Sequence, residues 1–355
     1  MSLSAGEAKA LLTRLTALPD PPPIMLWGAG GVGKSSVVKQ VCQERGWGFI
    51  DVRLLLLNPV DLRGLPVPNR EIRRAEWYIP AFLPDVLRDG PEGIILYDEI
   101  TSAPPAVQAA CYQILLDRRL GEYVLPPGWR QVAAGNRAQD RGVTNRMPAP
   151  LANRLIHIEV EPVFDDWKTW ALASGEIDYR VVAFLNFRPE LLYKFPDSAA
   201  EIRAYPTPRS WHFVSRVLPA FGSADDAYQA IAGCVGEGAA TEFTAFCRLM
   251  DQLPDVQAIL NGAQVAVPDR LDLLYALVSA LVSVLRTVSN HQRLANAFRY
   301  VTKMPIEFQT LFVLDLRAVG LQGQLAALPE FRSWAKDNTD VFAYGVGAQV
   351  GRGGW

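Results

Sequence analysis

The chain has 355 residues, of which 50% are hydrophobic and 20% charged, and its formal net charge is -2. This balance excludes a disordered, collagen-like or coiled-coil protein, and the length predicts two domains or one elaborated domain. The near-neutral charge disfavours a dedicated nucleic-acid binder, although a local basic patch is compatible with that average.

Four cysteines lie far apart without a C-x-x-C pair, and only three histidines are present, so neither a disulfide framework nor a zinc site is expected. The N-terminal segment has no apolar signal core. The longest uncharged stretches in the second half of the chain have 13 residues, which is shorter than the roughly 20 that a membrane-spanning helix needs. We therefore expect a soluble, cytoplasmic protein without a membrane segment.

Five short apolar runs alternate with helical segments in the first half of the chain: Ile24–Trp27, Gly48–Val52, Ile94–Tyr97, Gln131–Ala134 and Leu155–Val160. Such runs without polar alternation are typical of a parallel sheet that is covered by helices on both faces. We predict an α/β domain over residues 1–161.

Helical apolar spacing replaces the strand signals after Glu161. It covers Asp165–Ala173, Val181–Phe187, Arg209–Leu218, Ala227–Met250 and Arg270–Tyr300, with breaks at prolines and glycines. We predict a helical region over residues 162–344, and a glycine-rich tail over residues 345–355.

A glycine-rich pattern, G-x-x-x-x-G-K-[ST], follows the first strand and precedes a helical run, Ser36–Arg45. Its glycines allow backbone N–H groups to turn toward a triphosphate, and the N-terminus of the next helix favours the same anion. Lys34 is expected to reach the β- and γ-phosphates, and Ser35 to bind Mg²⁺. A turn without a ligand is the alternative. The predicted ATP-binding residues are Gly28, Ala29, Gly30, Gly31, Val32, Gly33, Lys34, Ser35 and Ser36.

Two adjacent carboxylates, Asp98 and Glu99, end the third apolar run. Alone, such a pair is more often a solvated strand end or a helix cap. Together with the glycine-rich loop, it favours a site for nucleotide hydrolysis, in which Asp98 holds Mg²⁺ beside Ser35 and Glu99 orients or deprotonates the attacking water.

A helix is predicted to continue to about Arg118, followed by a hairpin over Leu120–Gly128. The fourth apolar run then closes with Gly135 and Asn136. An asparagine at this strand end can hydrogen-bond both the γ-phosphate and the water without adding charge; an ordinary turn residue is the alternative.

Five arginines and one acidic residue, Asp140, lie between residues 130 and 154. Nucleic-acid binding and ordinary solvation are two interpretations. We favour a third, in which Arg154 reaches a neighbouring subunit's γ-phosphate, because a guanidinium stays charged and offers paired donors to phosphoryl oxygens. Arg146 is the second choice for this role. The five arginines are Arg130, Arg137, Arg141, Arg146 and Arg154.

The order of these signals, together with Pro208-Arg209-Ser210-Trp211 at the start of a later helix, resembles the AAA+ ATPases, and most closely the MoxR group. The resemblance implies that Asn136 is sensor 1, Arg209 is sensor 2 and Arg154 is the arginine finger. It also implies that the helical region is a lid, that the hairpin is a pre-sensor-1 hairpin, and that Leu57–Pro68 is an insert near the second helix.

Membership of that family implies a ring, usually a hexamer, that uses ATP and Mg²⁺ to remodel or activate a client protein, and a partner with a von Willebrand factor A-like domain. Candidate pore residues are Leu65, Val67, Tyr123, Val124 and Leu125, with simple packing as the alternative. We interpret the aromatic run Trp77–Pro84 as core or subunit interface, and His157 as a hydrogen-bonded structural residue. A nucleotide-switched scaffold, a nucleic-acid-directed motor and, more weakly, a small-molecule kinase remain open.

Overall fold

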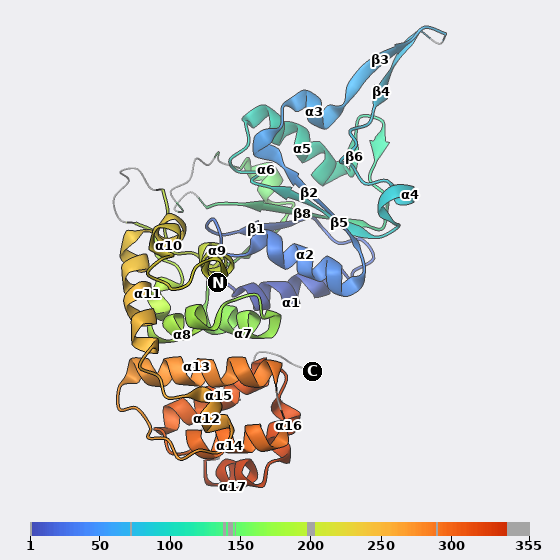
Figure 1. Cartoon of the computed structure of the whole chain (residues 1–355). Helices are drawn as coiled ribbons and strands as arrows, with labels where there is room; N and C mark the ends of the chain where they lie inside the picture. The colour runs from blue at the N-terminus through green and yellow to red at the C-terminus, as the bar shows by residue number, and fades with distance from the viewer. Residues whose placement is uncertain are drawn as a thin grey trace. The chain divides into compact units, whose positions relative to one another are not determined.

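The computed structural model (Figure 1) describes residues 2–71, 73–137, 140, 145, 147–196, 203–288 and 290–338. The chain divides into two compact units, Met1–Val163 and Phe164–Trp355. The predicted tail, residues 345–355, lies outside the described residues, as do Arg141 and Arg146.

The first unit is built on a parallel sheet of five strands in the order β2-β5-β8-β1-β9. All five predicted strands are confirmed, within two residues at each end. The inner strands β1, β5 and β8 are apolar and buried nearly throughout because both faces of the sheet are covered, whereas the edge strands β2 and β9 also carry exposed residues. The strands are β1 (Ile24–Trp27), β2 (Gly48–Arg53), β5 (Gly93–Asp98), β8 (Trp129–Gly135) and β9 (Ile156–Glu159).

Helices lie on both faces of this sheet (Figure 1). On one face, α2 (Lys34–Arg45) packs on β5 and β8, and α1 (Ala5–Leu15) packs on α2. On the other face, α5 (Pro105–Asp117) buries Val107, Ile114 and neighbouring side chains against the strands, together with α3 (Pro59–Arg63) and α6 (Ala149–Ala152). The predicted architecture is therefore confirmed: an α/β domain with a five-stranded parallel sheet, followed by a helical region.

Two small hairpins decorate the first unit. The predicted hairpin is present as β6 (Arg119–Leu120) and β7 (Tyr123–Val124). A longer hairpin, β3 (Leu65–Asn69) and β4 (Arg74–Tyr78), extends away from the sheet (Figure 1) and was not expected. Pro66 and Pro68 in β3 obscured its signal, because proline is uncommon inside strands. A short helix, α4 (Val86–Asp89), follows it.

Exposure in these hairpins corrects two predictions. The aromatic run was expected to be core or subunit interface, and the core alternative is wrong for Trp77, Tyr78 and Ile79, whose exposed fractions are 37%, 66% and 53%. The interface alternative stays a prediction. The pore prediction fails for Tyr123 and Leu125, which are buried, with the Tyr123 hydroxyl donating to the Pro84 carbonyl at 2.8 Å. The β3–β4 hairpin pairs only with itself and leaves these side chains exposed, whereas Tyr123 and Leu125 pack into the core of the first unit.

Leu65 and Val124 are exposed, with fractions of 60% and 52%. Both therefore remain candidates for contact with another molecule, and their place in a pore stays a prediction.

The second unit is helical among its described residues. Two predicted segments each form two helices. Residues 227–250 divide at Gly236, whose φ of +84° ends one helix and begins the next. Residues 270–300 divide before Asn290, whose side chain accepts a hydrogen bond from the Arg293 N–H and caps the second helix. The helices are α7 (Phe164–Ser174), α8 (Tyr179–Phe187), α9 (Pro208–Val217), α10 (Tyr228–Val235), α11 (Glu237–Met250), α12 (Val256–Leu260), α13 (Leu271–Thr287), α14 (His291–Val301), α15 (Ile306–Ala318), α16 (Gln322–Ala327) and α17 (Pro329–Asp337).

Helix α13 is buried over most of its length, and it contributes to two hydrophobic cores within the second unit. An ion pair joins α7 to α15, in which the Lys168 ammonium lies 2.6 Å from the Asp315 carboxylate. Burial raises the pKa of Asp315, and the charge of Lys168 lowers it. No helix in the described part of the chain is long and apolar enough to cross a membrane.

Candidate functional site

Three strands of the sheet end beside one another at the same edge. β1 ends at Trp27 and leads into the glycine-rich loop, β5 ends at Asp98, and β8 ends at Gly135. Because neighbouring strands run parallel, their carboxyl ends share one edge, which is where open α/β sheets bind ligands. The sheet therefore brings the glycine-rich loop, the two carboxylates and Asn136 together, as expected from the sequence.

The glycine-rich loop needs its glycines for defined reasons. A Cβ on Gly28 would lie 2.5 Å from the Val160 carbonyl oxygen, and Gly33 has a φ of +105° that side chains rarely adopt. Gly33 is also the N-cap of α2, and the first turn of α2 has neither a side-chain cap nor an acidic residue. The N–H groups at this helix end are thus available to an anion.

Lys34 is buried inside the loop. Its ammonium donates to the carbonyls of Gly28 at 2.6 Å and Ala29 at 2.9 Å, and to the Asn136 side-chain oxygen at 3.2 Å. This last contact places the Lys34 ammonium beside the first residue after β8. Lys34 and Asn136 are therefore placed to share one phosphate group.

Ser35 and Asp98 form the second pairing across the site. The Ser35 hydroxyl donates to the Asp98 carboxylate at 2.6 Å, which joins the start of α2 to the end of β5. A hydroxyl and a carboxylate are the hard oxygen ligands that Mg²⁺ prefers, so the two residues present fit this ion.

Glu99 directly follows Asp98 in a left-handed conformation, with a φ of +58°. Its N–H donates to the Asp98 carboxylate at 2.9 Å, and its carbonyl accepts from the N–H groups of Ser102 and Ala103. A non-glycine residue in this conformation costs about 1–3 kcal/mol, and such strain concentrates at functional sites. The Glu99 side chain is exposed, as a group that orients water needs to be.

Thr101 is a positioning residue that sequence reasoning missed. Its buried hydroxyl accepts from the Asn136 N–H at 3.1 Å and donates to the Asn136 carbonyl at 3.3 Å. It therefore ties the loop after β5 to the end of β8 and fixes the backbone of Asn136. A threonine two residues after an Asp-Glu pair carries no signal for this contact in the sequence alone.

Asp51, on β2, is a second residue that was missed. Its pKa is raised by burial first and by the nearby Asp98 carboxylate second, with a smaller contribution from Glu99. The Asp51 carboxylate therefore lies near those of Asp98 and Glu99, and Arg53, 4.0 Å away, partly offsets its charge. The available signal was an acidic residue inside an apolar strand.

The described arginines of the basic segment have different surroundings. Arg130 donates to the Thr16 carbonyl and to Glu92, and its guanidinium lies 4.2 Å from the centre of the Trp47 ring. Arg137 lies within 4 Å of three carboxylates, those of Asp140, Glu159 and Glu161. Its pKa is raised, chiefly by the hydrogen bond to Asp140 and then by Glu161.

Arg154, in contrast, is exposed, and its side chain makes no hydrogen bond or ion pair with the described residues. Arg209 is exposed on the first turn of α9, which Thr207 and Ser210 cap. It belongs to the second unit, so its sensor role stays a prediction.

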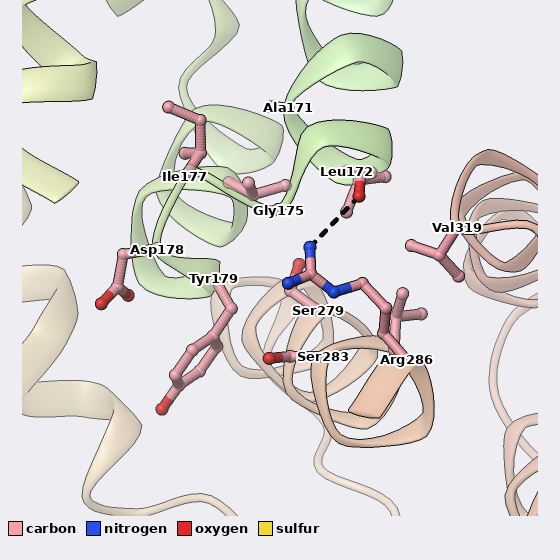
Figure 2. A pocket seen from close by; sticks show the side chains of 12 residues that line it. Ala171, Leu172, Gly175, Ile177, Asp178, Tyr179, Ser279, Ser283, Arg286 and Val319 are labelled. Carbon is pink, nitrogen blue, oxygen red and sulfur yellow. Dashed lines mark hydrogen bonds between the residues drawn. The ribbon is translucent and has the colours of Figure 1, made fainter. Parts of the chain in front are cut away.

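A cavity of about 240 Å³ lies within the second unit, between the α7–α8 loop and α13 (Figure 2). The Arg286 guanidinium donates to the Leu172 carbonyl at 3.4 Å. A Cβ on Gly175 would lie 2.0 Å from a nitrogen of the same guanidinium. Arg286 thus packs over the C-terminal end of α7, where a cation is favoured. None of the predicted site residues lines this cavity.

No protein-family model matches the chain. Among solved structures, NtrX from Brucella abortus is 15% identical, with 90% of this chain and 68% of that chain covered and a TM-score of 0.41. RuvB from Thermotoga maritima, a Holliday junction branch migration motor, is 18% identical, with 78% and 80% covered and a TM-score of 0.39. Both scores are below 0.5, so inferences about function rest on the residues of this chain.

Proposed function

We propose that the chain is an ATPase of the AAA+ type. The observation that carries this proposal is the pair of contacts across the strand ends: Ser35 with Asp98, and Lys34 with Asn136. Four groups with complementary roles in phosphate chemistry meet there, and the glycine-rich loop and the uncapped end of α2 face the same place.

The roles follow from the chemistry of each group. The loop N–H groups and Lys34 bind the phosphates, and Ser35 and Asp98 would hold Mg²⁺, whose charge offsets the charge on the phosphates when it is bound. Glu99 accepts a proton from the attacking water or orients it, and Asn136 hydrogen-bonds the same water or the γ-phosphate.

The assembly and the biological task are further parts of the proposal. Arg154 is exposed and lies outside the cluster formed by Lys34, Ser35 and Asp98, which suits a group that acts on a neighbouring subunit. We propose a ring, with a hexamer as the expected form, in which Arg154 is the finger and Arg209 senses the nucleotide from the helical region. The MoxR-like resemblance supports protein remodelling, a partner with a von Willebrand factor A-like domain and a cytoplasmic location.

The exposed base of the β3–β4 hairpin is our candidate for client contact. Leu65 and Tyr78 pair across the two strands, and their exposed fractions are 60% and 66%. Apolar side chains exposed side by side suit contact with an apolar protein segment.

Glu99→Gln tests the proposal directly. We expect ATP turnover to fall at least a hundredfold, within the range by which a positioned acid or base accelerates reactions, while ATP binding persists. Glu307→Gln is the matched control, because Glu307 is an exposed carboxylate in the helical unit. Unchanged turnover in Glu99→Gln would show that Glu99 does not act on the water.

The same measurements separate the two rival functions. A nucleotide-switched scaffold would bind ATP but show negligible turnover in the unmodified protein. A nucleic-acid motor would show turnover that DNA or RNA strongly stimulates, with binding that weakens steeply as salt increases.

A further inference from the structure

His157 makes two hydrogen bonds that join separate parts of the first unit. The Trp27 indole N–H donates to Nδ1 at 2.7 Å, and Nε2 lies 2.8 Å from the Ala152 carbonyl oxygen. An indole only donates and a carbonyl only accepts, so the ring carries its proton on Nε2 and its lone pair on Nδ1. The two rings also stack, with centroids 5.9 Å apart and 18° between their planes.

The two partners of His157 occupy informative positions. Trp27 is the last residue of β1 and directly precedes the glycine-rich loop. Ala152 is the last residue of α6, two residues before Arg154. The Ala152 carbonyl is one of the end carbonyls that a helix cannot satisfy internally, and it also accepts from the Leu155 N–H at 3.3 Å.

We propose that His157 is a positioning residue for Arg154. By holding the end of α6 against the last residue of β1, it gives the exposed arginine a fixed base from which to reach the neighbouring subunit. This inference rests on the proposed ATPase ring. Its physical reason is that an unpaired side chain takes its position from its backbone, and an error of about 1 Å in a catalytic group can cost about 10²-fold in rate.

Three substitutions separate the contacts of His157. His157→Val suits the strand but removes both bonds. His157→Gln can place an N–H donor near the position of Nε2, which keeps the bond to Ala152. His157→Asn can place an oxygen near Nδ1, which keeps only the bond to Trp27. We expect His157→Gln to retain more function than His157→Asn.

A mixed-subunit assay measures finger positioning separately from folding. Lys34→Ala subunits keep Arg154 but cannot use their own site, whereas Arg154→Ala subunits keep the site but lack the arginine. ATP turnover in the mixture therefore reports Arg154 donated by one subunit to the next. His157→Val is placed first in the donor, with Lys34→Ala, and then in the acceptor, with Arg154→Ala.

We expect turnover to fall about tenfold to a hundredfold when His157→Val is in the donor, and to change less than twofold when it is in the acceptor. The acceptor experiment also shows that the variant folds and hydrolyses ATP.

Any of three results would overturn the inference. If donors with and without His157→Val support equal turnover, or if the loss follows the acceptor, His157 does not position Arg154, although the proposed function stands. If the mixture of Lys34→Ala and Arg154→Ala subunits regains no turnover while the unmodified protein is active, Arg154 does not act across a boundary, and the inference fails with that part of the proposed function.

Discussion

Thr101→Val tests whether the loop after β5 positions Asn136. Valine has the shape of threonine but lacks the hydroxyl that contacts the Asn136 N–H at 3.1 Å and its carbonyl at 3.3 Å. Thr101 is only 3% exposed, so water cannot readily replace the hydroxyl. Leaving a buried donor unsatisfied costs about 1–3 kcal/mol. We expect the unfolding free energy of the first unit to fall by that amount.

Activity should fall as well, because Asn136 is expected to act on the reacting groups. Each 1.36 kcal/mol that is lost from the transition state lowers the rate about tenfold. If half of the upper value of about 3 kcal/mol is lost from transition-state stabilisation, turnover falls about tenfold. ATP affinity should change less, because the glycine-rich loop and Lys34 are unaltered.

Thermal unfolding and steady-state ATP turnover measure the two effects, with Thr101→Ser as the control that keeps the hydroxyl. For a unit of this size, the melting temperature should fall by about 2–4 °C for each kcal/mol. Equal melting temperatures and equal turnover for Thr101→Val and Thr101→Ser would refute the reasoning. If Thr101→Val lowers the melting temperature but not ATP turnover, Thr101 stabilises the fold without positioning Asn136 for catalysis.

Three further predictions concern single residues. Gly28→Ala should weaken ATP binding, measured by titration with a labelled nucleotide, because its Cβ would lie 2.5 Å from the Val160 carbonyl oxygen; unchanged affinity would show that the loop adjusts. Arg154→Ala should keep ATP binding but lower turnover by roughly 10³–10⁵-fold; normal turnover would place the finger elsewhere. Lys168→Met should lower the unfolding free energy by about 3–5 kcal/mol, because the buried Asp315 loses its counter-charge. Burial raises the Asp315 pKa, so the variant's stability should fall as pH rises from about 4, the unfolded value, through the folded value; a flat profile in chemical denaturation would contradict this.

The parts of the fold that were predicted from sequence are those with strong local patterns. The five strands are apolar runs bounded by glycine, proline or charge, and the glycine-rich loop has a fixed order of residues. The parallel arrangement then placed the ends of β1, β5 and β8 at one edge without any further information.

Contacts between distant residues could not be read in the same way. Thr101 and Asn136 are 35 positions apart, and their two hydrogen bonds depend on how the chain turns after β5. The β3–β4 hairpin was missed because its first strand alternates proline with other residues, which weakens the strand pattern. Long helical segments were joined in the prediction because apolar spacing continued across Gly236, a residue that ends one helix and starts the next.

The arginine-rich segment shows how a count of charges can mislead. By sequence, it could have been a basic patch for nucleic acid, with one acidic residue to offset it. In the structure, Arg137 lies against Asp140, Glu159 and Glu161, two of which come from beyond the segment.

Arg130 is likewise occupied, by Glu92 and the face of the Trp47 ring. Binding to a phosphate backbone depends on how many phosphates the lysines and arginines of a protein can contact. Of the three described arginines in the segment, only Arg154 has no oppositely charged partner nearby among the described residues. Among the described residues, the segment therefore offers one arginine without a carboxylate partner, which suits a group that contacts a single phosphate.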